Sequence, residues 1–177
     1  MTIRTCTLLL SILLLAACDG GTKERKAARG ENFVPAPNAL FFKNTRQRDY
    51  RLTDRGEAGN FFTHEDLQAS PATVLPVIHH DWINDRAYLQ LHTRSAAGPA
   101  SPSSPVKLYI TSATGTNAVS LAPKLDVAAT KRFAHHLSTN RPIRQLVGKD
   151  TVDVFPGEAR RHARESLADF LRLVDAD

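Results

Sequence analysis

The sequence VLPVIHHDWINDRAYLQLHT, residues 74–93, decides the fold class of this protein. Residues 74–80 form an apolar run of strand length, and residues 81–85 form a polar turn that carries the only tryptophan, Trp82. From Ala87 to Thr93, apolar side chains alternate with polar or aromatic ones, which is the period-two pattern of a half-buried strand. The stretch therefore predicts two neighbouring antiparallel strands joined by a short turn.

Further strands are expected downstream of this pair. Residues 106–110 alternate in the same way, and after a turn at Gly115 a short strand is expected at 119–121. We expect the strands of this middle region to form a three-stranded antiparallel meander. Residues 143–155 contain two apolar runs around Gly148, Lys149 and Asp150, which predicts a hairpin.

Upstream, two apolar runs at residues 40–42 and 50–52 are separated by polar residues, which predicts a β-hairpin over residues 38–53. After Phe61 and Phe62, we expect Thr63 to cap one short helical turn that Pro71 brings to an end.

The pattern changes to helical spacing after Pro123. Leu125, Ala129, Phe133 and Leu137 are four residues apart, so they lie on one face of a helix that Pro142 stops. A last helix is expected from residue 156 to about residue 174, and its apolar face comprises Ala159, Ala163, Leu167, Phe170, Leu171 and Val174. The fold class is therefore α+β: a small antiparallel β-sheet of meander and hairpins, with two amphipathic helices in the C-terminal half.

Length and composition fit a single globular domain. The chain has 177 residues, of which 42% are hydrophobic and 23% charged, and this balance excludes collagen, coiled coil and bulk disorder. Both cysteines lie within the first 18 residues. The formal net charge is +5, so its distribution along the chain matters more than its size.

The N-terminus reads as a secretory signal over residues 1–17. Arg4 supplies a positive charge, residues 8–15 are almost entirely apolar, and two alanines precede Cys18. The apolar run is shorter than the roughly 20 residues that a membrane-spanning helix needs. The sequence Leu15-Ala16-Ala17-Cys18 resembles the lipobox of bacterial lipoproteins. The resemblance implies that Cys18 is lipidated and becomes the first residue of the mature chain.

The same resemblance implies a location. In bacterial lipoproteins, an aspartate directly after the lipidated cysteine often goes with retention at the inner membrane, so Asp19 favours the periplasmic face of that membrane. Residues 18–37 are expected to be the lipidated cysteine and a flexible tether, and residues 38–177 a single periplasmic α+β domain. Such a domain contains no thiol, so no disulfide is expected in it.

Two polar clusters are candidates for chemistry. His79, His80 and Asp81 lie at the end of a strand, where a histidine beside a carboxylate is a candidate general base. Adjacent strand residues point to opposite faces, however, so the alternative is one packed and one exposed histidine. His64 and Glu65, with Asp66, would make a metal site with nitrogen and oxygen ligands if they folded against His79 or His80. Their alternative is a capped helical turn.

Known catalytic and metal-binding motifs are absent from the sequence. There is no H-E-x-x-H and no G-x-S-x-G, and we therefore expect no metal and no cofactor.

A basic helix face is the clearest candidate for binding. Lys131 with His135, and Arg132 with His136, form two cationic rows at i, i+4 spacing. Residues 95–149 hold seven Lys and Arg against one acid, which would attract an acidic protein partner, an envelope component or an anionic lipid surface. A periplasmic location argues against nucleic acid. The alternative is a solvated helix face.

Two further features have binding and structural alternatives. Trp82 is either a core plug or an interface anchor. The Pro-rich segment 95–105 is either a docking segment or a plain loop.

Three functions follow from these features. The leading one is a membrane-anchored periplasmic lipoprotein that binds a protein without catalysis, of the immunity or inhibitor type or as an envelope accessory. The second is a periplasmic hydrolase that uses His79, His80 and Asp81 with His64 and Glu65, which requires these residues to converge within about 5 Å. The third is a structural subunit of an envelope complex, for which an exposed apolar patch is the mark.

Overall fold

The computed structural model describes residues 30–95, 98–99, 105–112 and 115–176. The predictions for the signal, for Cys18 and Asp19, for most of the tether and for most of the 95–105 loop lie outside these residues. In chain order the main elements are α2 (Ala36–Phe41), β1 (Tyr50–Asp54), β2 (Asn60–His64), α3 (Glu65–Ala69), β3 (Val74–Asp81), β4 (Arg86–Ser95), β5 (Gly98–Pro99), β6 (Val106–Ser112), β7 (Gly115–Leu121), β8 (Lys124–Leu125), α4 (Val127–Ser138), β9 (Ile143–Val147), β10 (Asp150–Asp153) and α5 (Ala159–Leu173). The predicted class, α+β with antiparallel sheet, is confirmed.

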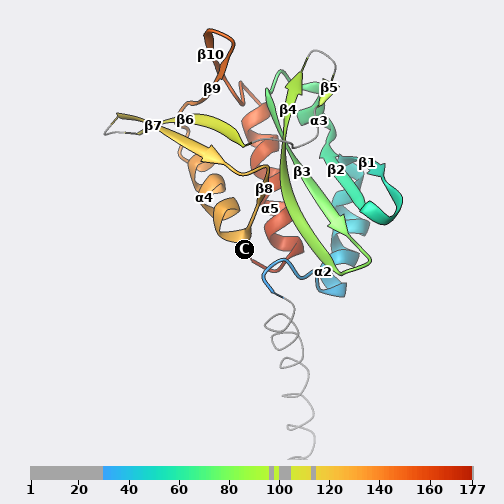
Figure 1. Cartoon of the computed structure of the whole chain (residues 1–177). Helices are drawn as coiled ribbons and strands as arrows, with labels where there is room; N and C mark the ends of the chain where they lie inside the picture. Colours follow the sequence, from blue (N-terminus) through green and yellow to red (C-terminus); the bar gives the residue numbers. More distant parts are fainter. Residues whose placement is uncertain (1–29, 96–97, 100–104, 113–114, 177) are drawn as a thin grey trace, which may run out of the picture.

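The first sheet has the order β1-β2-β3-β4-β5, with β8 also paired to β4, and every pairing is antiparallel. The predicted pair at residues 74–93 is its centre: β3 and β4 pair from Val74 opposite Thr93 to Asp81 opposite Arg86. In Figure 1 the long helix α5 lies across one face of this sheet, and α4 lies beside it. The alternation of apolar residues along β4 is explained by this one-sided burial.

The second sheet has the order β10-β9-β6-β7. The predicted hairpins β6–β7 and β9–β10 both form, but the expected three-stranded meander is wrong because β4 and β6 belong to different sheets. Strand β6 takes β9 as its second neighbour, with Tyr109 opposite Arg144 and Ile110 opposite Ile143. A period of two tells which face of a strand is buried, and it does not tell which strand lies alongside.

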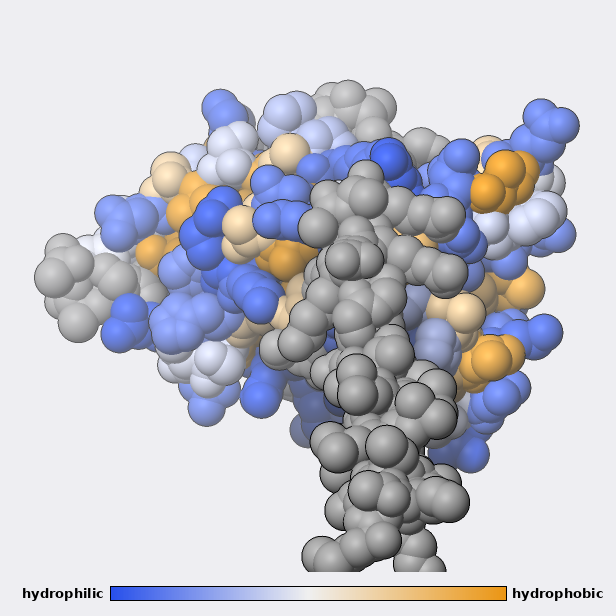
Figure 2. Space-filling view, turned by 90° about the horizontal axis from the view of Figure 1, so that it is seen from below, coloured by the Kyte–Doolittle hydropathy of each residue, from blue (hydrophilic) through white to orange (hydrophobic). Residues whose placement is uncertain are grey.

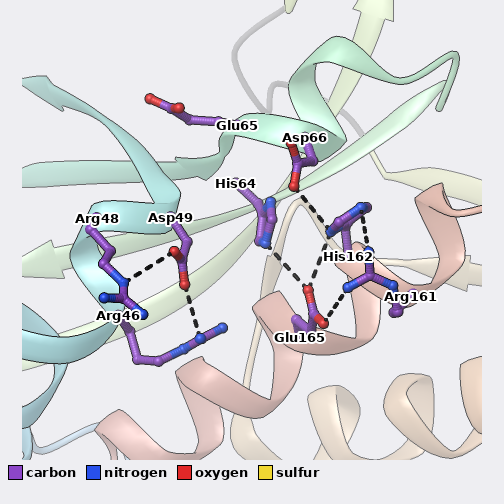
Figure 3. Close-up of a pocket in the computed structure, with 9 residues that line it drawn as sticks. All are labelled: Arg46, Arg48, Asp49, His64, Glu65, Asp66, Arg161, His162 and Glu165. Atoms are coloured by element: carbon purple, nitrogen blue, oxygen red, sulfur yellow. Dashed lines mark hydrogen bonds and ion pairs between the residues drawn. The ribbon is translucent and has the colours of Figure 1, made fainter.

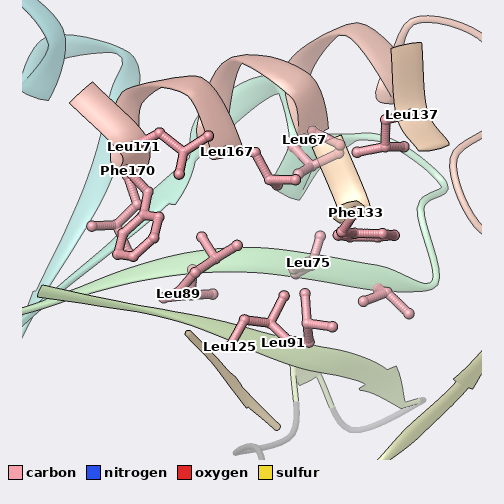
Figure 4. Packing of buried hydrophobic residues seen from close by; sticks show 14 of the residues in the cluster. Leu67, Leu75, Leu89, Leu91, Leu125, Phe133, Leu137, Leu167, Phe170 and Leu171 are labelled. Carbon is pink, nitrogen blue, oxygen red and sulfur yellow. The ribbon is translucent and has the colours of Figure 1, made fainter. Parts of the chain in front are cut away.

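Both predicted C-terminal helices form. Helix α4 begins at Val127 because Leu125 pairs with Leu89 as part of β8, and the Asp126 carboxylate caps the helix by accepting a hydrogen bond from the Ala129 amide at 2.6 Å. All six residues of the predicted apolar face of the last helix are buried. They pack with side chains of α3, α4, β3 and β4 in one continuous core (Figure 4).

The predicted hairpin over residues 38–53 is wrong in its first half. Residues 40–42 are helical, because Pro35 and Pro37 start a helix well and Phe42 turns inward onto Phe62, with ring centroids 5.1 Å apart. A π-helical turn, Phe42–Arg46, and a 3₁₀ turn, Gln47–Asp49, then lead into β1, which begins at Tyr50 as predicted.

Two smaller expectations also change. Thr63 belongs to β2 and does not cap α3, although the short helix exists. Phe33 and Val34 are buried, so the globular part begins before the predicted boundary at residue 38. None of the described helices is both long and apolar enough to cross a membrane.

Candidate metal centre

The candidate site lies where the end of β2 meets α5. His64 is the last residue of β2 and shares a sheet face with Phe62, the face that α5 covers. On α5, His162 and Glu165 are three residues apart, so both side chains project from the same side of the helix. Figure 3 shows the three side chains pointing toward one another, with Asp66 of α3 on the rim.

The distances are short enough for one ligand sphere. Glu165 Oε2 lies 3.3 Å from His64 Nε2 and 3.2 Å from His162 Nδ1. All three ligand atoms lie within 4.8 Å of one another, and Asp66 Oδ2 lies 3.7 Å from His162 Nδ1. With metal–ligand bonds of about 2.0–2.2 Å, the edges of a tetrahedral zinc site measure about 3.3–3.6 Å. Two of the three distances are thus close to those edges.

The protonation states suit a metal ligand set. Burial, followed by the neighbouring His162, holds the pKa of His64 below its usual value and outweighs the opposing pull of Glu165, so the imidazole is neutral at pH 7. Burial raises the pKa of Glu165, but the Arg161 hydrogen bond and charge outweigh it, so that pKa is lowered and the group is a carboxylate. Neutral imidazole and ionised carboxylate are the forms that bind metals.

Hydrogen bonds hold the site in its present form. Arg161 Nη2 lies 3.2 Å from His162 Nε2, so the ring accepts there and donates from Nδ1 to Glu165. His64 Nδ1 is buried and has no hydrogen-bond partner among the described residues. A metal on His162 Nδ1 would require a proton on Nε2, so Arg161, whose side chain is 56% exposed, would have to release that atom.

The three residues open onto a cavity of about 450 Å³. Two further arginines, Arg46 and Arg48, and Asp49 line it as well. Arg46 is held by Asp49 and by the buried Asp169, each at 2.9 Å. A metal with three protein ligands would therefore face a roomy, strongly polar cavity on its open side, which is how catalytic and exchangeable sites differ from closed structural ones.

The predicted hydrolase set does not assemble. His79 projects from the opposite face of the first sheet, where its ring stacks on Phe61 with centroids 4.3 Å apart. Asp81 accepts hydrogen bonds from Asn84 in the turn, and His80 points to the other side of β3 from His79. Glu65 lines the cavity, but its carboxylate points away from the two histidines (Figure 3). Of the predicted residues, only His64 and the rim residue Asp66 face the site.

His162 and Glu165 were not among the site residues predicted from the sequence. Glu165 also forms an ion pair with Arg161 at 2.8 Å. The available signal was the spacing His162-x-x-Glu165 on a predicted amphipathic helix, which puts two metal-binding side chains on one face. Their partner His64 lies on an element far away in the sequence, and no spacing rule connects them.

The predicted binding residues lie elsewhere. On α4, Lys131, Arg132 and His135 are exposed, and His136 is half-buried. Arg132 and His136 line a groove of about 460 Å³ between α4 and β7, whose floor includes Phe133. Trp82 is 54% exposed at the turn between β3 and β4, so it is not a core plug.

A row of hydrogen bonds crosses the outer face of the first sheet. His79 Nε2 lies 2.6 Å from the Ala58 carbonyl oxygen, Gln90 Nε2 lies 3.3 Å from His79 Nδ1, and His92 Nε2 lies 3.2 Å from Gln90 Oε1. Burial, helped by the charge of Arg55, lowers the pKa of His92 to about 4. The His92 ring is therefore neutral in the folded state over most of the pH range.

This shift makes stability sensitive to acid. Unfolded His92 takes up a proton near pH 6.5, whereas the folded form resists it down to about pH 4, so the unfolded state binds more protons between those values. We expect the free energy of unfolding to fall by up to about 3 kcal/mol on this account as the pH drops from 7 to 4. Urea unfolding measured across that range checks it, with His92→Gln as the comparison. If the free energy of unfolding depends on pH equally in the wild-type protein and in His92→Gln, the acid sensitivity does not come from His92.

Comparisons with models of protein families, with curated protein sequences and with solved structures find no match to this chain. The contacts of His64, His162 and Glu165 are therefore the basis of the functional proposal.

Proposed function

We propose that this chain is a lipid-anchored protein of the bacterial envelope. We further propose that its folded domain binds a divalent transition metal ion, preferably zinc, at His64, His162 and Glu165. One observation carries the metal proposal. Three ligand atoms from two elements far apart in sequence lie within 4.8 Å, and two of their separations are close to the edges of a zinc tetrahedron.

The ligand types favour zinc over calcium or magnesium. Two imidazole nitrogens and one carboxylate oxygen suit borderline transition metals, whereas calcium and magnesium require sites made of oxygen ligands. Asp66 is near enough to His162 to serve as a fourth ligand after a small movement, because its side chain is 70% exposed. A water molecule from the cavity is the other candidate for that position.

Zinc titration of the untagged mature chain, followed by displacement of a coloured chelator, tests the metal site. We expect one ion per chain, and we expect His162→Ala to weaken the affinity at least about 100-fold, since even residues that only support metal ligands cost 10–100-fold. His135→Ala is the matched control, because that histidine is exposed on α4 and has no place in the site. Equal affinities of the two variants would rule out the site.

The anchoring half of the proposal rests on the lipobox-like Leu15-Ala16-Ala17-Cys18. Mass spectrometry of the membrane fraction is expected to find an acylated Cys18 as the first residue. A chain that begins at Met1 without the modification would contradict it.

A second candidate function is favoured by the groove between α4 and β7. The groove combines an apolar floor with Lys124, Arg132 and His136 on its rim, against the single acid Asp126, which is engaged in capping α4. These features fit an acidic segment of a partner protein, in keeping with an immunity, inhibitor or accessory role.

Photocrosslinking from a probe at position 120, which lines the groove, tests this candidate in envelope preparations. We expect a single defined crosslinked partner, lost on Arg132→Glu and kept on Arg144→Glu. Both variants change the net charge equally, and Arg144 is an exposed residue of β9 outside the groove. A crosslink that survives Arg132→Glu would count against the groove.

A further inference from the structure

Four of the seven large apolar side chains that are exposed among the described residues lie at one end of the molecule. Six of the seven form adjacent pairs: Leu40 and Phe41 at the end of α2, Trp82 and Ile83 in the turn between β3 and β4, and, at the opposite end, Leu146 and Val147 of β9. Leu40, Phe41, Trp82 and Ile83 are 58%, 44%, 54% and 53% exposed. We call these four residues the tether-end surface.

The fold places both pairs where the described chain begins. The Val34 amide donates to the Asp85 carbonyl oxygen at 2.8 Å, and the Ala87 amide donates to the Asn32 carbonyl oxygen at 2.9 Å. The segment that leads into α2 is therefore fastened to the strand ends next to Trp82. In Figure 1 α2 and the β3–β4 turn lie at the lower end, and in Figure 2, which looks at that end, hydrophobic surface shows in separate patches among hydrophilic side chains.

We propose that the tether-end surface rests in the interfacial layer of the lipid bilayer to which the chain is attached. The proposal rests on the lipidation of Cys18 put forward above. About 12 residues separate Cys18 from Gly30, and an extended chain of that length reaches roughly 40 Å at most. The anchor therefore keeps this end of the domain close to the bilayer. The effective concentration of the tether-end surface at the bilayer is then high, so even a weak apolar contact is populated.

The chemistry of the four side chains fits a lipid interface. Tryptophan is enriched at the boundary between headgroups and acyl chains, and phenylalanine, leucine and isoleucine supply buried apolar area. In this proposal the four apolar side chains carry the contact, so anionic lipid is not required.

Trp82 is the only tryptophan of the chain, so its fluorescence reports this contact directly. The test uses residues 18–177, whose core lies between Val34 and Val174 and so loses no member. Cys18 is the only thiol of that chain, and it can be coupled to a maleimide lipid in neutral phosphatidylcholine vesicles that contain brominated acyl chains. We expect bromine to quench at least half of the Trp82 emission, with a shift to shorter wavelength and protection from iodide.

The control moves the reporter to the far end of the molecule. In Trp82→Phe combined with Leu146→Trp, the new tryptophan sits on β9, at the opposite end in Figure 1, and we expect no bromine quenching. Ile83→Asp should at least halve the quenching of Trp82 while leaving the circular dichroism spectrum unchanged. If Trp82 is not quenched by bromine and is as open to iodide as the control, or if quenching needs anionic lipid, the proposal fails.

The chemical coupling separates the membrane contact of the tether-end surface from the lipidation of Cys18 in cells. It attaches the domain to the bilayer whether or not cells lipidate Cys18, so an absent contact overturns the surface proposal alone. The mass of the native N-terminal peptide decides the anchor independently.

Discussion

Replacing Asp169 by Ala is expected to lower the free energy of unfolding by about 3–5 kcal/mol. The Asp169 carboxylate is 3% exposed and accepts hydrogen bonds from Arg46 Nε at 2.9 and 3.0 Å, from Tyr50 Oη at 2.8 Å and from Arg172 Nη1 at 3.2 Å. Burial, followed by the charge of Asp169, raises the pKa of Tyr50 far above its usual value, so this hydroxyl stays a donor. Without the carboxylate, the buried Tyr50 hydroxyl loses this acceptor, and Arg46 keeps only its ion pair with Asp49.

Urea unfolding followed by circular dichroism measures this effect. Asp150→Ala removes an exposed carboxylate from the β9–β10 hairpin and is expected to change stability by no more than about 0.5 kcal/mol. Tyr50→Phe removes a single hydrogen bond and is expected to cost about 1 kcal/mol. A loss below 1 kcal/mol in Asp169→Ala would show that the network contributes little.

Phe133→Ala is expected to cost a similar 3–5 kcal/mol. The ring is 1% exposed on the inner face of α4 and lies 6.1 Å from the ring of Phe155, which follows β10. It therefore sits where α4 and the second sheet meet the common core (Figure 4), and its removal leaves a cavity that the surrounding helices and strands fill only in part.

The same substitution at an exposed phenylalanine is the control. Phe41 is 44% exposed and touches the Arg172 guanidinium, 5.7 Å from its ring centroid. We expect Phe41→Ala to cost less than about 1 kcal/mol. Equal losses in the two variants would mean that Phe133 is not part of the cooperative core.

An element is predictable from the sequence when contacts between residues close in the sequence determine it, and not when a contact between distant residues does. The β3–β4 pair and the face of α5 follow from local periodicity, because burial on one side imposes a period of 2 or 3.6 on the chain. Local periodicity did not predict that Leu40 and Phe41 are helical. Two apolar residues before a polar stretch fit a strand equally well, and the choice is made by the packing of Phe42 onto Phe62.

The candidate site shows the same limit more sharply. His64 was recognisable as a metal-binding residue type near acidic neighbours, but its expected partners, His79 and His80, lie on another part of the sheet. The real partners come from α5, which crosses the face of the sheet to which His64 points. Only the packing of that helix on β2, a long-range contact, reveals which histidine His64 meets.

The pairing of β6 with both β7 and β9 has a consequence for the order of folding. The β6–β7 hairpin closes a loop of a few residues, whereas the β6–β9 ladder closes a loop that contains β7, β8 and the whole of α4. The entropy lost on closing a loop grows with its length, and long-range pairing slows folding. We therefore expect the β6–β9 ladder to form after the β6–β7 hairpin, and until it forms β6 exposes one free edge with which another chain could pair.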